Sequence, residues 1–187
     1  MKKLPTSLPG VWLLEPRVFE DPRGHFYESY RQDTFRALGI EETFVQDNHS
    51  FSRRGVLRGL HYQLGRPQAK LVRVLQGEVF DVAVDVRRGS PTFGRGVGEV
   101  LSRENRRQMF VPRGFAHGFL VLSETAEFLY KCSDFYAPDQ ERGLLWNDPA
   151  IAIPWPLNGM TPELNQRDAG YPRLADVPSG DLPPYDQ

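Results

Sequence analysis

Turn-forming residues interrupt this sequence so often that no long regular element can form. The 187 residues include 17 glycines and 16 prolines, spread along the chain. Between them lie short stretches rich in valine, phenylalanine, leucine and tyrosine, which favour strands. Many short strands joined by turns are typical of a sandwich or barrel. We therefore expect an all-β protein, a jelly roll of the cupin type with a few short helices.

The clearest strand pattern runs from Lys70 to Val86. An apolar run ends at the turn pair Gln76-Gly77, and residues then alternate between two faces, of which the one bearing Asp81 is the more polar. A face of that kind can line a wet cavity. Further strands are expected at residues 98–101, 108–111, 118–122 and 126–134, with extended segments at 11–19 and 24–30.

Helical patterns are few. Residues 33–38 predict one short helix, with Asp33 or Thr34 as its N-cap and Gly39 as its stop. Residues 158–187 are rich in proline and polar residues, and we expect them to wrap the surface with a helical turn near Glu163. Because no repeat or linker divides the chain, residues 1–187 predict a single domain that includes this C-terminal tail.

Charge and cysteine content narrow the classes of function. The 23 Lys and Arg residues balance 24 Asp and Glu residues, so a global electrostatic attraction to nucleic acid is not expected. Cys132 is the only cysteine, which excludes an intramolecular disulfide and fits a reducing compartment. No stretch approaches the roughly 18 apolar residues that span a bilayer. We expect a cytoplasmic protein that binds neither nucleic acid nor a membrane.

Two of the four histidines have a setting that suits chemistry. His61 and His117 each follow a glycine-bearing turn and are flanked by apolar residues, and imidazole is the side chain best suited to take a proton near neutral pH. Jelly-roll metalloenzymes often place a second histidine two residues after the first, where this chain has Gln63. With only Glu141 as a further candidate ligand, we expect no metal.

Cations lie close to His61, and several enzyme motifs are absent. Arg58 and Lys70 flank the histidine and can hold a phosphate or polarise a carbonyl oxygen. The sequence has no P-loop, no Gly-x-Gly-x-x-Gly dinucleotide motif and no Gly-x-Ser-x-Gly nucleophile elbow. A nucleophilic-serine hydrolase and a nicotinamide enzyme of the Rossmann type are therefore unsupported.

A series of motifs in one order resembles a known family. They include FEDPRGHFYE at 19–28, FVQDNHS at 44–50, GVLRGLHYQ at 55–63, KLVR at 70–73, GEVFDVAVD at 77–85, PRGFAHGF at 112–119, LYK at 129–131, WNDP at 146–149 and LNQRD at 164–168. Together they cover about residues 10–170 and resemble the dTDP-4-dehydrorhamnose 3,5-epimerase family. The resemblance implies a cupin-type homodimer that acts as an isomerase without metal or organic cofactor.

The resemblance also implies a substrate and a set of site residues. The substrate would be the dTDP-linked 4-keto-6-deoxy sugar dTDP-4-dehydro-6-deoxy-D-glucose, converted to dTDP-4-dehydro-L-rhamnose on the route to dTDP-L-rhamnose for cell-surface polysaccharide. His61 matches the base, Asp168 the carboxylate that orients it, Tyr130 the acid on the other face, and Lys70 the group that stabilises the enolate oxygen. The matching substrate-binding positions are Arg23, Glu28, Gln46, Asn48, Arg58, His117, Glu141 and Arg167.

Three other hypotheses remain open at this point. The first is an epimerase of the same group that inverts only C3 or only C5 of a related sugar. The second is a metal-dependent cupin oxygenase or isomerase. The third is a sugar-nucleotide binding protein without activity, which the presence of both a base and an opposing acid argues against.

Overall fold

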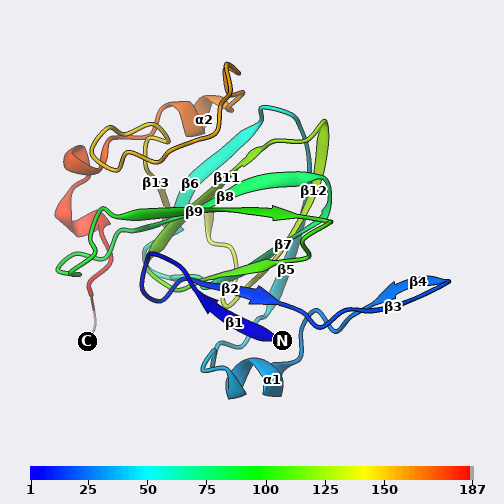
Figure 1. Cartoon of the computed structure of the whole chain (residues 1–187). Coiled ribbons are helices and arrows are strands. Elements are labelled where there is room, and N and C mark those ends of the chain that lie inside the picture. The colour runs from blue at the N-terminus through cyan, green and yellow to red at the C-terminus, as the bar shows by residue number, and fades with distance from the viewer. Residues whose placement is uncertain (186–187) are drawn as a thin grey trace.

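Two antiparallel β-sheets face each other in the computed structural model, which describes residues 1–185 (Figure 1). The first, here the Lys70 sheet, contains β1 (Lys2–Pro5), β2 (Trp12–Glu15), β5 (Gln46–Arg53), β7 (Lys70–Gln76), β10 (Gln108–Val111) and β12 (Thr125–Cys132). The second, here the His61 sheet, contains β6 (Leu57–Gln63), β8 (Glu78–Asp85), β9 (Gly96–Ser102), β11 (Phe115–Val121) and β13 (Glu141–Gly143). This is the predicted all-β jelly roll of the cupin type.

Strand order brings the central strands of each sheet together. The Lys70 sheet has the order β1-β2-β10-β7-β12-β5, and the His61 sheet has the order β13-β6-β11-β8-β9. Neighbours that are distant in the sequence require crossings between the two sheets, as in a jelly roll. The predicted strands at 108–111 and 126–134 are confirmed as β10 and β12, whereas β5 and β6 were not predicted as strands.

The predicted alternation along β8 is present, and each of its two faces contributes to a hydrophobic layer. Val79 and Ala83 lie in the core between the sheets, while Val82 and Val84 pack on the other side with residues of the C-terminal half such as Leu144. A third layer covers part of the Lys70 sheet on its outer side, beneath helix α1 (Gln32–Ala37), whose buried residue is Phe35. The inner layer fills one end of the space between the sheets, and its Asp81-bearing face continues towards a cavity.

Two helical features differ in detail from the predictions. Helix α1 has Arg31, not Asp33 or Thr34, as its N-cap, because the Asp33 carboxylate already accepts from the Thr34 amide inside the first turn. The helical turn expected near Glu163 is α2 (Gln166–Ala169) instead. Glu163 itself forms a bridge beside Val56, with the Leu57 amide donating to its carbonyl oxygen at 2.9 Å, and this bonding holds it extended.

The C-terminal segment is packed along the His61 sheet. It contains α2 and the short 3-10 helices η2 (Leu174–Asp176) and η3 (Ser179–Asp181), while η1 (Pro138–Gln140) precedes β13. Asp186 and Gln187, the end of the predicted tail, lie outside the described residues. Within residues 1–185, no helix is long and apolar enough to cross a membrane.

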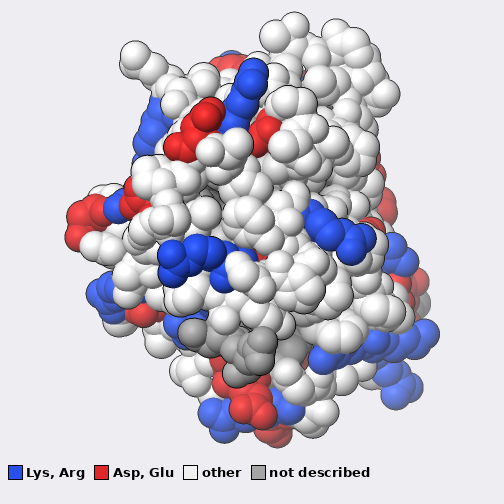
Figure 2. Space-filling view, turned by 90° about the vertical axis from the view of Figure 1, so that its left-hand side faces the viewer, with Lys and Arg blue, Asp and Glu red and all other residues white. Residues whose placement is uncertain are grey.

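A two-stranded arm stands away from the body of the protein. It is formed by β3 (Phe19–Asp21) and β4 (Gly24–Phe26), which pair with each other in a sheet of their own. Figure 1 shows this arm extending well beyond both large sheets. On the opposite side of the molecule, Figure 2 shows basic and acidic side chains interspersed over the surface, in keeping with the nearly balanced charge.

Gly59 allows strands β6 and β11 to approach closely beside His61. Its φ is +112°, and a Cβ there would lie 2.6 Å from the His117 carbonyl oxygen and 2.7 Å from the Gly118 Cα. The register of β6 and β11 shifts at this point. The expected turn before His61 is therefore an irregularity inside strand β6, for which glycine is the compatible residue.

Substituting Gly59→Ala should lower the free energy of unfolding by about 3 kcal/mol, from backbone crowding combined with the unfavourable positive φ. Denaturant unfolding monitored by circular dichroism measures this change. Gly89→Ala is the matched control, since Gly89 has a φ of +88° with no atom within 4 Å of the added Cβ. A loss no greater than that of the control would contradict the steric argument.

Candidate active site

A cavity of about 400 Å³ opens between the two sheets. Its volume lies within the usual range for small-molecule sites. Ten of the twelve site residues predicted from the sequence line it: Gln46, Asn48, Arg58, His61, Lys70, His117, Tyr130, Glu141, Arg167 and Asp168. Residues from seven strands or segments far apart in the sequence thus meet in one space.

His61 is held by a carboxylate from the C-terminal segment. Its Nε2 lies 2.9 Å from Oδ1 of Asp168, which stands on α2 and is only 1 % exposed. The other carboxylate oxygen accepts from the Gly59 amide at 3.0 Å. Asn165 caps α2 by accepting from the Asp168 amide at 2.7 Å. With Nε2–H donating to Asp168, the free lone pair of the imidazole is on Nδ1.

The charge of Asp168 is maintained by its partners. Burial alone would raise the pKa of this carboxyl, but the bond and charge of His61, the Gly59 amide and Arg167 outweigh burial and hold the pKa below its ordinary value. The His61 ring also packs edge-on against Tyr171, at 5.7 Å between centroids. The histidine is therefore fixed in orientation beside a group that stabilises its protonated form.

A second histidine–carboxylate pair lies next to the first. His117 is the cross-strand partner of His61, and its Nε2 lies 2.9 Å from Oδ1 of Asp81 on β8. Asp81 is fully buried, which raises the pKa of its carboxyl against the opposing effects of His117 and Lys70. The sequence pattern on β8 identified the polar face but did not assign Asp81 to the site.

Lys70 and Tyr130 line the cavity from the opposite sheet. Loss of solvation lowers the pKa of Lys70, although the nearby Cys132, Glu141 and Asp81 act in the other direction. Burial, with Cys132 adding to it, raises the pKa of Tyr130. The phenol therefore keeps its proton at neutral pH. A ligand between the sheets has an imidazole on one side and a protonated phenol on the other.

At the mouth of the cavity, several polar groups bond to Glu141. Arg167 Nη1 lies 2.6 Å from its Oε1, and the Tyr171 hydroxyl donates to the same oxygen at 3.1 Å. Tyr136 also lines the cavity and is about half exposed. The bond to Glu141 raises the pKa of the Tyr136 hydroxyl, together with partial burial.

Arg23 and Glu28 are not in this cavity. Arg23 lies in the turn of the arm, where its side chain is 91 % exposed and pairs with Asp21 at 2.6 Å. Glu28 follows the arm and pairs with Arg31 at 3.4 Å. The structure therefore brings together the catalytic candidates but leaves these two binding candidates outside the same chain's cavity.

Sequence reasoning missed several lining residues. Asn165 had a detectable pattern, because an Asn three residues before an Asp is a capping arrangement at a helix start. Tyr136 and Tyr171 had no such pattern, since they lie in irregular segments that only tertiary contacts bring to the cavity. Among residues 1–185, no cluster of three His, Cys, Asp or Glu side chains is arranged to hold a metal ion.

Comparison with known proteins agrees with this geometry. The family model described as dTDP-4-dehydrorhamnose 3,5-epimerase matches residues 5–176. The dTDP-4-dehydrorhamnose 3,5-epimerase of Pseudomonas aeruginosa is 60 % identical over 178 residues, covering 95 % of this chain and 98 % of the relative.

Solved structures show the same relationship. The dTDP-6-deoxy-D-glucose-3,5-epimerase of Legionella pneumophila, in complex with dTDP-4-keto-L-rhamnose, has a TM-score of 0.97 at 50 % identity and covers 100 % of this chain and 99 % of its own. A 3'-monoepimerase of Streptomyces bikiniensis, in complex with dTDP-quinovose, has a TM-score of 0.91 at 37 % identity, with 97 % and 93 % covered. The chain belongs to the dTDP-4-dehydrorhamnose 3,5-epimerase family.

Proposed function

We propose that this protein is an isomerase that inverts C3 and C5 of dTDP-4-dehydro-6-deoxy-D-glucose to give dTDP-4-dehydro-L-rhamnose. The observation that carries the proposal is the pairing of a carboxylate-bound imidazole on one sheet with a protonated phenol on the facing sheet. Inversion requires a base and an acid on opposite faces of one carbon, which a binding protein does not need. The family relationship supports this substrate and both inversions.

His61 is the proposed base. The C4 ketone acidifies the hydrogens on both C3 and C5, so one base beside the ketone can serve either carbon. Nδ1 of His61 accepts the proton, and the electron pair of the C–H bond moves into an enolate. Asp168, bonded to Nε2 at 2.9 Å, stabilises the resulting imidazolium and keeps the ring in place.

Lys70 is proposed to stabilise the enolate. Charge develops on the C4 oxygen as the proton leaves, and a cation already in place there lowers the barrier without reorganisation. Burial lowers the pKa of Lys70, and the nearby Glu141 and Asp81 act against that loss of the ammonium charge. Lysine is suited to this role because its compact charge can approach one oxygen closely.

Tyr130 is proposed as the acid that completes each inversion. Its raised pKa keeps the hydroxyl protonated until a carbanion is present. The hydroxyl donates its proton to the face of the carbon opposite His61, and the enolate returns to the ketone. His61 and Tyr130 then exchange protons with solvent through the open cavity, which restores both groups for the second carbon.

The nucleotide half is proposed to bind at the mouth. Arg58, whose Nε donates to Ser52 Oγ at 3.1 Å, and Arg167 supply cations for the diphosphate. The thymine ring is proposed to stack on Tyr136, which is the cavity-lining aromatic residue with the most exposed surface among those described. Phe119 and Phe128, by contrast, are buried in the core between the sheets.

Deuterium labelling tests this function. Incubation of the protein with dTDP-4-dehydro-6-deoxy-D-glucose in deuterated water should give a product with inverted configuration and deuterium at both C3 and C5, because each new proton comes from a solvent-exchanged tyrosine. Nuclear magnetic resonance resolves the two carbons, and substrate incubated without protein controls for spontaneous exchange. Label and inversion at a single carbon would instead identify a single-centre epimerase, and inversion lost on chelation would identify a metal-dependent enzyme.

The arm supports a further proposal, that the protein acts as a homodimer in which Arg23 serves the partner's cavity. Phe26 is 71 % exposed on β4, and Phe19 is half exposed on β3. Exposed aromatic residues on a projecting hairpin indicate a surface that a partner covers. Phe51, on β5 of the Lys70 sheet, is also exposed and offers a second copy an apolar surface. A symmetric dimer would bury the same surfaces on both copies.

Mixing two inactive variants tests whether the arm acts across the dimer. Arg23→Ala removes a binding cation and His61→Ala removes the base, so each variant alone should have little activity. After unfolding and refolding together, about one quarter of the sites should be complete, since half of the dimers are mixed and one site in each mixed dimer has both residues. Light scattering reports the dimer. No recovery of activity would place Arg23 outside the partner's site.

A further inference from the structure

We propose that Gln63 is a positioning residue that fixes Tyr136 at the cavity mouth and thereby sets the affinity for the nucleotide. Gln63 ends strand β6, two residues after His61, and Tyr136 lies in the segment 133–137 between β12 and η1, here called the mouth segment. The proposal rests on the proposed function in taking a dTDP nucleotide as the ligand and in placing its thymine ring on Tyr136. It concerns a residue that does not itself line the main cavity.

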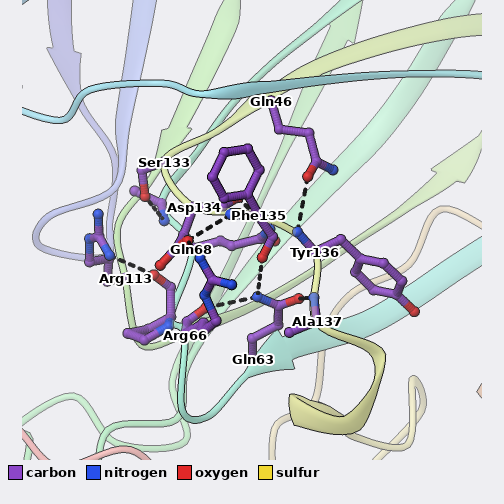
Figure 3. Close-up of polar contacts among 12 residues, drawn as sticks. Gln46, Gln63, Arg66, Gln68, Arg113, Ser133, Asp134, Phe135, Tyr136 and Ala137 are labelled. Atoms are coloured by element: carbon purple, nitrogen blue, oxygen red, sulfur yellow. Dashed lines mark hydrogen bonds and ion pairs between the residues drawn. The ribbon is translucent and has the colours of Figure 1, made fainter.

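Gln63 bonds to the backbone on both sides of Tyr136. Its Nε2 donates to the Phe135 carbonyl oxygen at 3.3 Å and to the Arg66 carbonyl oxygen at 2.7 Å. Its Oε1 accepts from the Ala137 amide at 2.8 Å. Figure 3 shows the Gln63 side chain directed at the mouth segment, with these bonds drawn. Both peptide neighbours of Tyr136 are therefore held by one side chain.

A second glutamine holds Tyr136 itself. Oε1 of Gln46 accepts from the Tyr136 amide at 2.9 Å, and its Nε2 donates to Asn48 Oδ1 at 3.0 Å. Gln46, which was predicted to bind substrate, lines the cavity, and its side-chain amide also bonds to the mouth segment and to Asn48. The start of the segment is held separately, by Gln68 donating to the Asp134 carbonyl oxygen at 2.8 Å and by the Arg66–Asp134 ion pair (Figure 3).

Hydrogen bonds position the mouth segment because hydrophobic packing contributes little there. Phe135 and Tyr136 are both half exposed, so little apolar surface anchors them. Gln63, in contrast, is only 4 % exposed, and all of its bonding partners are backbone groups. If its amide is removed, the Ala137 amide and the Phe135 carbonyl oxygen lose their partner, and the cheapest way to satisfy them is for the segment to move towards water.

The position of Gln63 on β6 connects the mouth segment to the strand that carries His61. It shares a face of the strand with His61, and it pairs across the strands with Glu141 of β13. Strand β6 thus fixes the positions of His61, Glu141 and the Tyr136 backbone relative to one another. Gln63 also occupies the place where a metal-binding jelly roll would carry its second histidine, and here its amide is directed at backbone groups.

Gln63→Met tests the proposal, because methionine keeps the length of the side chain but makes none of these bonds. We expect the Kd for dTDP, measured by calorimetry, and the KM for the sugar nucleotide to rise about 10-fold, the order expected for loss of one base-stacking contact. The kcat should change by less than about 3-fold, since His61, Lys70 and Tyr130 stay in place. An unchanged Kd, or a fall in kcat with KM unchanged, would overturn the proposal.

Asn105→Leu is the matched control. Asn105 also makes three side-chain bonds to the backbone, with the Ser102 and Arg107 amides and the Val100 carbonyl oxygen, but in the turn between β9 and β10 away from the cavity. We expect the Asn105→Leu variant to have the same Kd for dTDP and the same KM for the sugar nucleotide as the unchanged protein. An equal rise in this control would show that loss of backbone bonds anywhere weakens binding, and would count against a specific role.

A double-mutant cycle tests whether Gln63 affects the Kd for dTDP through Tyr136. In a Tyr136→Ala background, Gln63→Met should change the Kd by less than about 2-fold, because residues that act through one contact are not additive. A full 10-fold change in that background would overturn the proposal. If Gln63→Met does not fold, Gln63→Glu serves instead. It retains the acceptor for Ala137 but turns a carboxylate oxygen towards the Phe135 and Arg66 carbonyl oxygens, so its Kd should rise at least as much. Failure of the unchanged protein to turn over the sugar would refute the proposed function and leave the dTDP measurement intact.

Discussion

The buried carboxylate of Asp168 is the interaction on which the rest of the site depends. An ionised carboxylate at 1 % exposure is costly unless every oxygen is bonded, and here one oxygen meets His61 and the other meets the Gly59 amide. The same contact attaches the C-terminal segment to strand β6, because α2 is held at the point where the catalytic imidazole must be oriented. Removing the carboxylate would therefore affect both the packing of that segment and the tautomer of the base.

The two facing sheets divide the proposed chemistry between them. The His61 sheet supplies the base and the His117–Asp81 pair, helix α2 supplies Asp168, and the Lys70 sheet supplies the acid and the cation. The hydrophobic core between the two sheets holds them at a fixed separation. In this core, the rings of Phe128 and Phe119 stack at 4.2 Å between centroids. Hydrophobic packing at one end thus fixes the distance between the catalytic groups at the other, which is how a close-packed interior transmits geometry.

The sequence predicted those parts of the structure in which local pattern and tertiary role coincide. Alternation on β8 identified both its faces correctly, and the histidines with their flanking cations were recognised as a group. Strands β5 and β6 were not predicted, because β5 alternates polar side chains that face a cavity and β6 contains Gly59 at a positive φ. The approach of Asp168 to His61 spans 107 residues, and only the family resemblance indicated it. No sequence pattern links Gln63 to Tyr136, since their contact exists only once β6 and the mouth segment are adjacent.

The central claim is that His61 removes the proton and Tyr130 returns it to the other face. Tyr130→Phe in deuterated water tests this most directly, with His61→Ala as its counterpart. Tyr130→Phe should incorporate deuterium beside the ketone with the original configuration retained, because His61 removes a proton and returns a deuteron to the same face. His61→Ala should incorporate no deuterium above background. Inversion at the unchanged rate in Tyr130→Phe, or undiminished exchange in His61→Ala, would contradict the account.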